Sequence, residues 1–196
     1  MARREAEKRP YQQKRRAALT AETRRRIVEA AIDLHTEFGP GRTTISMVAE
    51  RAGVQRHTFY AHFPDERSLL MACSGESMAR DPLPDADPWC EIARPKARLK
   101  TGLMALYGWY ERNAALAACV LRDAAYHELV RDISALRWGP AMARITEVLG
   151  QGLEPRQMPL LHLALSFHSW RSLVQESGLP TDAAVDAMVA AVFARP

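Results

Sequence analysis

Cysteine is scarce in this chain of 196 residues, and the three that occur lie far apart. Cys73, Cys90 and Cys119 form no CxxC pair, which excludes a disulfide framework and the common zinc-binding modules. This pattern is typical of proteins in a reducing cytosol, so we expect a cytoplasmic location. The simplest interpretation of each cysteine is a small buried side chain, and redox sensing is the alternative.

Long apolar runs are also missing from the sequence. No segment approaches the ~18 consecutive apolar residues that a membrane-spanning helix requires. The charged N-terminus is not followed by an apolar stretch, so it does not have the pattern of a secretory signal. We therefore expect a protein that has no membrane as its partner.

Motifs of the common enzyme classes are absent as well. The sequence contains no GxGxxG, P-loop, HExxH or GxSxG pattern. His162 and His168 are six residues apart, a spacing that does not place two metal ligands on one face of a helix. We therefore expect that the chain is not an enzyme and that it holds neither a cofactor nor a metal ion.

Hydrophobic residues, in contrast, are plentiful, and the charged residues are unevenly distributed. The hydrophobic fraction of 47% is enough to build a sizeable core. Residues 1–75 hold 14 Lys and Arg against 9 Asp and Glu, whereas residues 76–196 hold 13 against 14. A basic excess confined to one part of a chain is an electrostatic signature of nucleic-acid binding. The N-terminal part is therefore the candidate for contact with nucleic acid.

A first helix is expected from about residue 23 to residue 38, with Thr20 as its N-terminal cap. Apolar residues that recur at helical spacing predict one buried stripe on it: Ile27, Ala30, Ala31, Leu34 and Phe38. Three arginines, residues 24–26, follow its predicted start. They are unfavourable for the helix dipole there but well placed to meet a phosphate backbone.

Residues 44–63 predict two short helices joined by a tight turn. Thr44 is a suitable cap for the first helix, and Gly53 supplies a positive φ at the turn without steric cost. Val54 and Phe59 are expected to plug the turn and the second helix into the core. The second helix directs Arg, His, Thr and Tyr side chains outward, as a helix-turn-helix does when its second helix enters a DNA major groove.

The whole chain is expected to be all-α, because no segment alternates as a strand does. We expect a flexible basic arm at residues 1–19, a helix-turn-helix DNA-binding domain at residues 20–73 and a helical ligand-binding and dimerisation domain at residues 74–196. A loop rich in proline and aspartate at residues 81–88 follows the DNA-binding part. The arm either contacts phosphates or the minor groove beside the main site, or is a solvated tail without function.

Five helical segments are expected in the C-terminal part: residues 99–110, 115–126, 133–149, 158–177 and 182–194. Gly139-Pro140 is expected to kink or split the third of them. The last two are more apolar than a single buried face needs. They either form a four-helix bundle with a second copy of the chain, with Val189 in the interface, or close the core of the monomer.

Aromatic and polar residues of these helices, together with one methionine, are candidates for a small-molecule site: Tyr107, Tyr110, Trp138, Met142, Phe167, His168 and Arg171. Mostly apolar walls with a few polar groups are what such a site needs. Aromatic stripes on helices are, however, more often plain core. His168 and Arg171 are the polar members, and an interface or solvent-facing pair is the alternative for them.

Residues 22–73 resemble the DNA-binding domain of the TetR family of transcriptional regulators. The matching stretches are Thr43-Thr44-Ile45, residues 48–54, residues 58–63, Leu69-Leu70 and the upstream helix at residues 26–39. The resemblance implies an all-helical homodimeric repressor. It also implies that the partner is a palindromic operator in double-stranded DNA, and that a small-molecule effector releases the repressor.

Position by position, the resemblance implies eight DNA contacts: Thr44, Gln55, Arg56, His57, Thr58, Tyr60, His62 and Arg67. Thr44 would hold a phosphate through its hydroxyl and backbone N–H groups. Arg56 is the expected base reader, because its guanidinium fork matches guanine O6 and N7. Tyr60 and His62 would contact phosphates. Arg67 would take over the phosphate contact of a lysine that the family often places one position earlier.

Two other function classes stay open at this point. A DNA-binding module without a ligand, silenced by a partner protein or acting as architecture, would have a filled C-terminal core without a cavity. An enzyme would need a convergent set of polar residues, and the sequence presents none.

Overall fold

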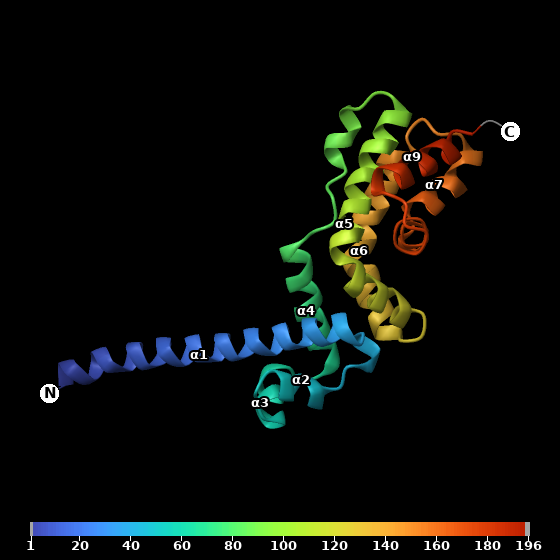
Figure 1. The fold of residues 1–196 in the computed structure, drawn as a ribbon. Coiled ribbons are helices and arrows are strands. Elements are labelled where there is room, and N and C mark those ends of the chain that lie inside the picture. Colours follow the sequence, from blue (N-terminus) through green and yellow to red (C-terminus); the bar gives the residue numbers. More distant parts are fainter. Residues whose placement is uncertain (1, 195–196) are drawn as a thin grey trace.

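The computed structural model describes residues 2–194, with side chains from residue 12 onward, and within that range it contains helices and no strand (Figure 1). The all-α fold class is therefore confirmed. The α-helices are α1 (Ala2–Glu37), α2 (Ile45–Arg51), α3 (Arg56–His62), α4 (Glu66–Arg80), α5 (Pro95–Ala124), α6 (Glu128–Gly150), α7 (Met158–Leu165), α8 (Phe167–Trp170) and α9 (Thr181–Val192). Short 3-10 turns occupy Pro40–Arg42, Asp87–Glu91 and Pro155–Gln157, and a π-helical turn occupies Arg171–Glu176.

Helix α1 begins much earlier than predicted. It runs as one helix from Ala2 rather than from residue 23, so the segment expected to be an arm extends the helix away from the body (Figure 1). Thr20, the predicted cap, lies within α1, and its hydroxyl donates to the carbonyl of Arg16 at 2.9 Å. The segment is rich in Ala, Arg, Glu, Lys and Gln, which favour helix even without apolar periodicity. Met1 and residues 195–196, at the ends of the predicted domains, lie outside the described residues.

Helices α1 to α4 share a hydrophobic core in the N-terminal part. The predicted stripe on α1 is confirmed at Ile27, Ala30, Ala31 and Leu34, which are buried, whereas Phe38 is 38% exposed. Phe38 lies one residue beyond the end of α1, next to Gly39, and so leaves the helical stripe. The boundary predicted between residues 73 and 74 lies within α4, which links this core to the second one.

The second core lies among α5 to α9, where α5 and α6 are the long elements that run side by side (Figure 1). The break predicted between residues 110 and 115 is absent, since α5 is continuous and residues 111–114 contain no glycine or proline. Pro140 lies within α6 without splitting it. None of the described helices combines the length and apolarity needed to cross a membrane.

The single helix predicted for residues 158–177 is broken at Ser166. Ser166 is extended, with φ −71° and ψ 132°, and its hydroxyl accepts the backbone N–H of His168 at 3.2 Å. Two carbonyls left by the break are satisfied from α5. The hydroxyl of Tyr107 donates to Ala164 at 2.9 Å, and the hydroxyl of Tyr110 donates to Leu165 at 2.6 Å. The break therefore depends on residues more than fifty positions away, which no local pattern reveals.

A polar clamp joins the end of α5 to the loop before α2. Buried Asp123 accepts the backbone N–H of Gly41 at 2.8 Å, and the neighbouring Arg122 donates to the carbonyl of Phe38 at 2.7 Å. Burial acts to raise the pKa of Asp123, but hydrogen bonds from Arg122 and Gly41 outweigh it and hold this pKa below its usual value. The clamp fixes the C-terminal body to the loop that leads to Thr44.

His35 and Cys73 lie together at the junction of the two cores, with Nδ1 and Sγ 3.6 Å apart. Burial lowers the pKa of His35 to about 4, although Asp123 acts in the opposite direction. Burial also raises the pKa of the Cys73 thiol to about 12. The thiolate of Cys73 is therefore scarce near neutral pH, which favours the structural interpretation of this cysteine over redox sensing.

The buried imidazole predicts a loss of stability on mild acidification. Because the pKa of His35 is lower in the folded chain than in the unfolded chain, the unfolded chain binds more protons between pH 6.5 and 4. Lowering the pH through this window should remove roughly 3 kcal/mol from the free energy of unfolding. Urea titrations at pH 7 and at pH 4.5 measure this difference in the free energy of unfolding. In His35→Leu, which has no titrating group there, most of this difference should vanish; an equal loss in both proteins would assign it to other groups.

Candidate nucleic-acid interface

The local signals predicted for the two-helix motif are present in the structure. Thr44 caps α2, and its Oγ1 accepts the backbone N–H of Met47 at 3.3 Å. Gly53 has a φ of +64°, and the next residue, Val54, returns its N–H to the carbonyl of Ala49 at 2.9 Å. This places α3 across the end of α2 in a fixed geometry.

Arg26 holds the turn between α2 and α3. Its Nε donates to the carbonyl of Ala52 and its Nη2 donates to the carbonyl of Gly53, each at 3.2 Å. The end of α2 leaves carbonyls without helical partners, and a guanidinium satisfies two acceptors at once. Arg26 therefore braces the motif, a role that the expectation of a phosphate contact did not include.

The other two arginines of this run also have partners within the protein. The guanidinium of Arg24 lies 4.7 Å from the centre of the Phe63 ring, a cation–π contact. Arg25 forms an ion pair with Glu22 at 2.7 Å. In the continuous α1 these arginines lie in the second half of the helix, whereas a helix beginning near residue 23 would have them at its N-terminus.

Helix α3 separates its buried residues from its exposed ones. Phe59 is fully buried, as predicted, and it packs against Phe63 with ring centres 5.9 Å apart. The exposed members of the predicted DNA contacts are Thr44, Gln55, Arg56, His57, Tyr60 and Arg67, and the half-buried members are Thr58 and His62. Arranged in this way, α3 has one face in the core and a polar face that points to solvent.

The charges on this polar face are not neutralised by the protein. Neither Arg56 nor Arg67 belongs to an ion pair among the described residues, whereas nearby Arg51 pairs with Glu37 at 2.9 Å. Gln55 occupies the position before α3 without a capping side-chain hydrogen bond, so its amide is available to a partner. Two free guanidinium groups and a free amide can bind the phosphates and the base edges of a nucleic acid.

The candidates for a small-molecule site do not converge on one cavity. Tyr107 and Tyr110 cap the break in the C-terminal helices, and Phe167 packs with Tyr110 and Trp170 at ring distances of 5.4 and 5.3 Å. The remaining candidates are scattered: His168 is exposed, Arg171 pairs with Glu176 at 3.0 Å, Met142 packs on the core, and Trp138 lines a cavity.

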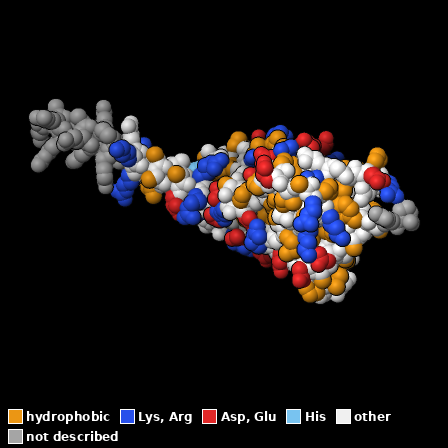
Figure 2. Space-filling model, turned by 90° about the horizontal axis from the view of Figure 1, so that it is seen from above, with side chains coloured by type: hydrophobic (Ala, Val, Ile, Leu, Met, Phe, Trp, Pro, Cys, Tyr) orange, Lys and Arg blue, Asp and Glu red, His pale blue; other side chains and the backbone are white. Residues whose placement is uncertain are grey.

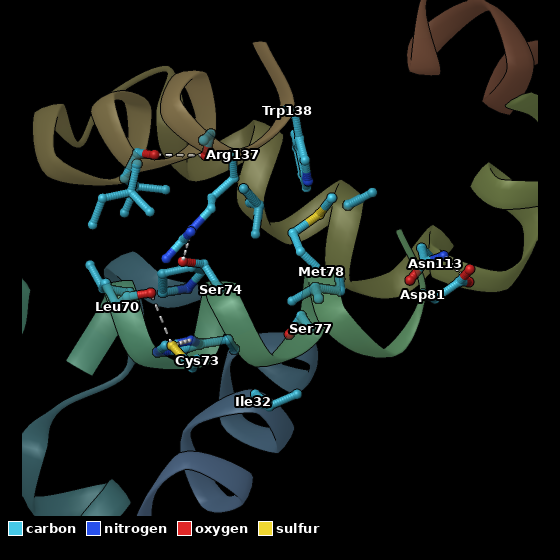
Figure 3. Close-up of a pocket in the computed structure, with 18 of the residues that line it drawn as sticks. Ile32, Leu70, Cys73, Ser74, Ser77, Met78, Asp81, Asn113, Arg137 and Trp138 are labelled. Atoms are coloured by element: carbon cyan, nitrogen blue, oxygen red, sulfur yellow. Dashed lines mark hydrogen bonds between the residues drawn. The ribbon is translucent and has the colours of Figure 1, made fainter. Parts of the chain in front are cut away.

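That cavity lies where α1, α4, α5 and α6 meet, at the junction of the two cores, and has a volume of about 70 Å³ (Figure 3). Arg137 and Trp138 face it from α6, opposite Ser74 and Met78 on α4. Its remaining lining residues are Ile32, His35, Pro40, Leu70, Cys73, Ser77, Asp81, Trp109, Asn113, Leu116, Ala117, Val120, Val130, Ile133 and Ser134. Of the predicted small-molecule candidates only Trp138 lines this cavity, because helical periodicity does not distinguish a residue that lines a cavity from one in a filled core.

Residues 27–73 match the family model of bacterial regulatory proteins, tetR family. An uncharacterized HTH-type transcriptional regulator of Mycobacterium tuberculosis is 42% identical over 50 residues, which are 26% of either chain. The HTH-type transcriptional regulator SrpR of Pseudomonas putida is 38% identical over 56 residues, which are 29% of this chain and 26% of SrpR. The matched segments thus span about a quarter of these relatives' length.

Solved structures share the whole architecture. The transcriptional regulator FadR from Bacillus subtilis, in complex with stearoyl-CoA, aligns with a TM-score of 0.61 at 17% identity, over 85% of this chain and 96% of FadR. A TetR-like transcriptional regulator from Rhodococcus sp. RHA1 aligns with a TM-score of 0.60 at 17% identity, over 87% of this chain and 93% of that one. At such identities the likeness shows a common fold.

The braced two-helix motif, its polar outer face and the all-helical body are the features of helix-turn-helix transcriptional regulators. Residues 27–73 therefore form a DNA-binding domain of the TetR type, and the chain shares the fold of TetR-like regulators. Regulators of this family bind DNA and are not enzymes, in agreement with the expectation from the sequence.

Proposed function

We propose that the chain is a repressor that binds a palindromic DNA operator as a homodimer and leaves it when a small molecule binds the helical body. The observation that carries the proposal is the outer face of α3, where Gln55, Arg56 and His57 are exposed while buried Phe59 holds the helix in place. Binding to operator DNA would place its action in the cytoplasm.

The DNA contacts divide into positioning and reading. Thr44 offers its hydroxyl proton and the free N–H groups at the start of α2 to a phosphate. Tyr60, which is 42% exposed, His62 and Arg67 flank α3 and would position the helix on the backbone. Arg56, in the first turn of α3 and free of ion pairs among the described residues, is the side chain suited to a guanine edge.

Arg56→Ala should relax sequence preference. Losing a bidentate contact to guanine should cost about 1–3 kcal/mol of discrimination at one base pair of each half-site. Competition binding with single-base variants of the selected operator measures this, and Arg51→Ala, which removes an arginine that pairs with Glu37, is the matched control. Unchanged preference in Arg56→Ala would remove its role as a base reader.

The extension of α1 gives the basic arm a defined shape. Basic side chains gather along the part of α1 that projects from the body, where Lys14, Arg15 and Arg16 are exposed (Figure 2). We propose that this segment adds phosphate contacts beside the main site, because neighbouring charges of one sign favour a polyanion.

Val189, the residue expected in the dimer interface, is not available to a second copy of the chain. Val189 is only 3% exposed and faces the core of its own subunit. Exposed apolar side chains remain nearby on α7, where Leu160 is 36% and Leu163 is 51% exposed. We propose that α7 and the outer face of α9 pack against a second copy, because burying this surface yields about 25 cal/mol per Å².

Leu163→Glu should convert the dimer to monomer, since it places a charge in the proposed apolar interface. Light scattering coupled to size exclusion measures the mass of the particle. His162→Glu, a substitution at the neighbouring exposed position, tests whether any charge on α7 has this effect. A dimer that survives Leu163→Glu would move the interface to another face.

A ligand-free module is the second candidate, and the cavity at the junction of the cores favours the ligand-responsive one. A filled body was the feature expected of a module without an effector, and the structure instead has a largely apolar space lined by α4. FadR, which shares the fold, was solved with a bound stearoyl-CoA. If two arrangements of α4 differ in their affinity for DNA, a molecule that binds one of them better changes the DNA affinity of the protein by linkage.

A further inference from the structure

Arg137 bridges α6 and α4 at the edge of the cavity. Its Nε donates to the hydroxyl of Ser74 at 3.1 Å (Figure 3). Its Nη2 donates to the carbonyl of Met71 at 2.8 Å. Gly75 permits this approach, because a Cβ there would lie 3.1 Å from Nη2 of Arg137. The bridge thus joins the body to the helix that directly follows α3.

The positive charge of Arg137 has only neutral acceptors among the described residues. Asp81, the carboxylate that also lines the cavity, is already paired with Arg112 at 2.9 Å and accepts the amide of Asn113 at 2.8 Å. His35 is neutral near pH 7, because burial lowers its pKa to about 4. The cavity therefore presents one half-buried cation without a counter-ion, beside walls that are mainly apolar.

We propose that the effector is a small hydrophobic carboxylate whose carboxyl group pairs with Arg137 and whose apolar part lies among Leu70, Met78, Trp109 and Trp138. A guanidinium binds a carboxylate through two parallel charge-assisted hydrogen bonds, which are stronger than those to a hydroxyl and a carbonyl. A cationic ligand is disfavoured, since Asp81 is neutralised by Arg112.

The ligand class follows from the cavity alone, but the effect of the ligand on DNA binding rests on the proposed function. The cavity of about 70 Å³ is smaller than the roughly 300–1,000 Å³ of sites that bury drug-sized ligands, so Arg137 must turn to make room. When it turns toward a carboxylate, it leaves Ser74 and the carbonyl of Met71. Helix α4 then loses a contact to α6, and α3, which precedes α4 by a three-residue connection, changes position.

The ligand class is tested on the full-length chain by calorimetry, without DNA. The probes are benzoate, its neutral and cationic counterparts benzamide and benzylamine, and acetate, which has the charge but almost no apolar part. Benzoate should bind at least about tenfold more tightly than each of the others, as a charge-assisted pair and apolar burial together require. Equal binding of benzoate and benzamide, or no binding of benzoate at millimolar concentration, overturns the proposal.

Variants test the residue itself. Arg137→Gln should weaken benzoate binding by about 10- to 100-fold. Arg137→Lys keeps the charge but cannot form two parallel hydrogen bonds, so its affinity for benzoate should lie between those of the wild type and Arg137→Gln. Gly75→Ala should tighten benzoate binding slightly, because the added Cβ makes the guanidinium of Arg137 shift and so weakens its contact with α4 while keeping its charge. Arg156→Gln, which removes an exposed arginine paired with Glu154 outside the cavity, is the control and should change nothing. Unchanged binding in Arg137→Gln overturns the assignment, and thermal melts confirm that each variant is folded.

The regulatory part has its own readout. Benzoate at saturation should lower the affinity for the selected operator at least about fivefold, as typical coupling between two sites does, and Arg137→Gln should abolish this response. Benzoate binding that depends on Arg137 but leaves operator affinity unchanged overturns the release route. Failure of the wild-type chain to bind any operator would instead refute the proposed function, while the calorimetric result on the ligand class would stand.

Discussion

Replacing Gly39 with alanine should lower the free energy of unfolding by about 3 kcal/mol. Gly39 has φ 96° and ψ 155°, a region essentially restricted to glycine, where another residue costs about 1–3 kcal/mol. An added Cβ would also overlap Nη2 of Arg122 and Oδ2 of Asp123. The substitution therefore strains the backbone and displaces the clamp that fixes the loop before α2.

Differential scanning calorimetry measures this loss as a decrease of about 10 °C in the melting temperature. Gly178→Ala is the matched control, because Gly178 also has a positive φ, +71°, but no other heavy atom lies near the position of an added Cβ. It should cost only about 1 kcal/mol. Equal effects of the two substitutions would mean that the clamp of Arg122 and Asp123 contributes nothing beyond backbone strain.

Phe59→Ala and Tyr60→Phe should separate the two faces of α3. Phe59 is fully buried, so removing its ring should cost about 3–5 kcal/mol and abolish DNA binding through loss of the folded motif. Tyr60→Phe removes one exposed hydroxyl and should leave stability unchanged, while weakening the binding of all DNA sequences alike.

Chemical denaturation and binding titrations with operator and with scrambled duplex measure both effects. A Tyr60→Phe variant that loses affinity for the operator alone would contradict its assignment to phosphate. A Phe59→Ala variant of normal stability would contradict the placement of this ring in the core of the motif.

The parts of the fold that could be predicted from the sequence depend on local signals. Thr44, Gly53 and Phe59 act within a few residues of their own position, as caps, turns and plugs do, and each lies where it was expected. The exposed face of α3, which we propose meets DNA, follows from the same register. Helix α1 is the local exception, because its N-terminal half has helical propensity without the apolar period that the prediction relied on.

The parts that could not be predicted depend on partners distant in sequence. The break at Ser166 is compensated by the hydroxyls of Tyr107 and Tyr110, so these tyrosines are structural caps although their pattern fitted a ligand site equally well. Arg26 similarly found its acceptors at the turn between α2 and α3, twenty-six and twenty-seven residues away. Periodicity shows that a side chain faces inward but not whether it meets another side chain, a carbonyl or a cavity.

Selection of DNA from a random-sequence pool with the full-length chain, followed by titration of the enriched duplex, tests the central claim most directly. We predict an inverted repeat whose half-sites lie about one helical turn apart, bound at least ~10³-fold more tightly than a scrambled duplex at physiological salt. Arg56→Ala should reduce this ratio. A pool that shows no enriched sequence, or an enriched duplex bound no better than the scrambled one, would contradict the account.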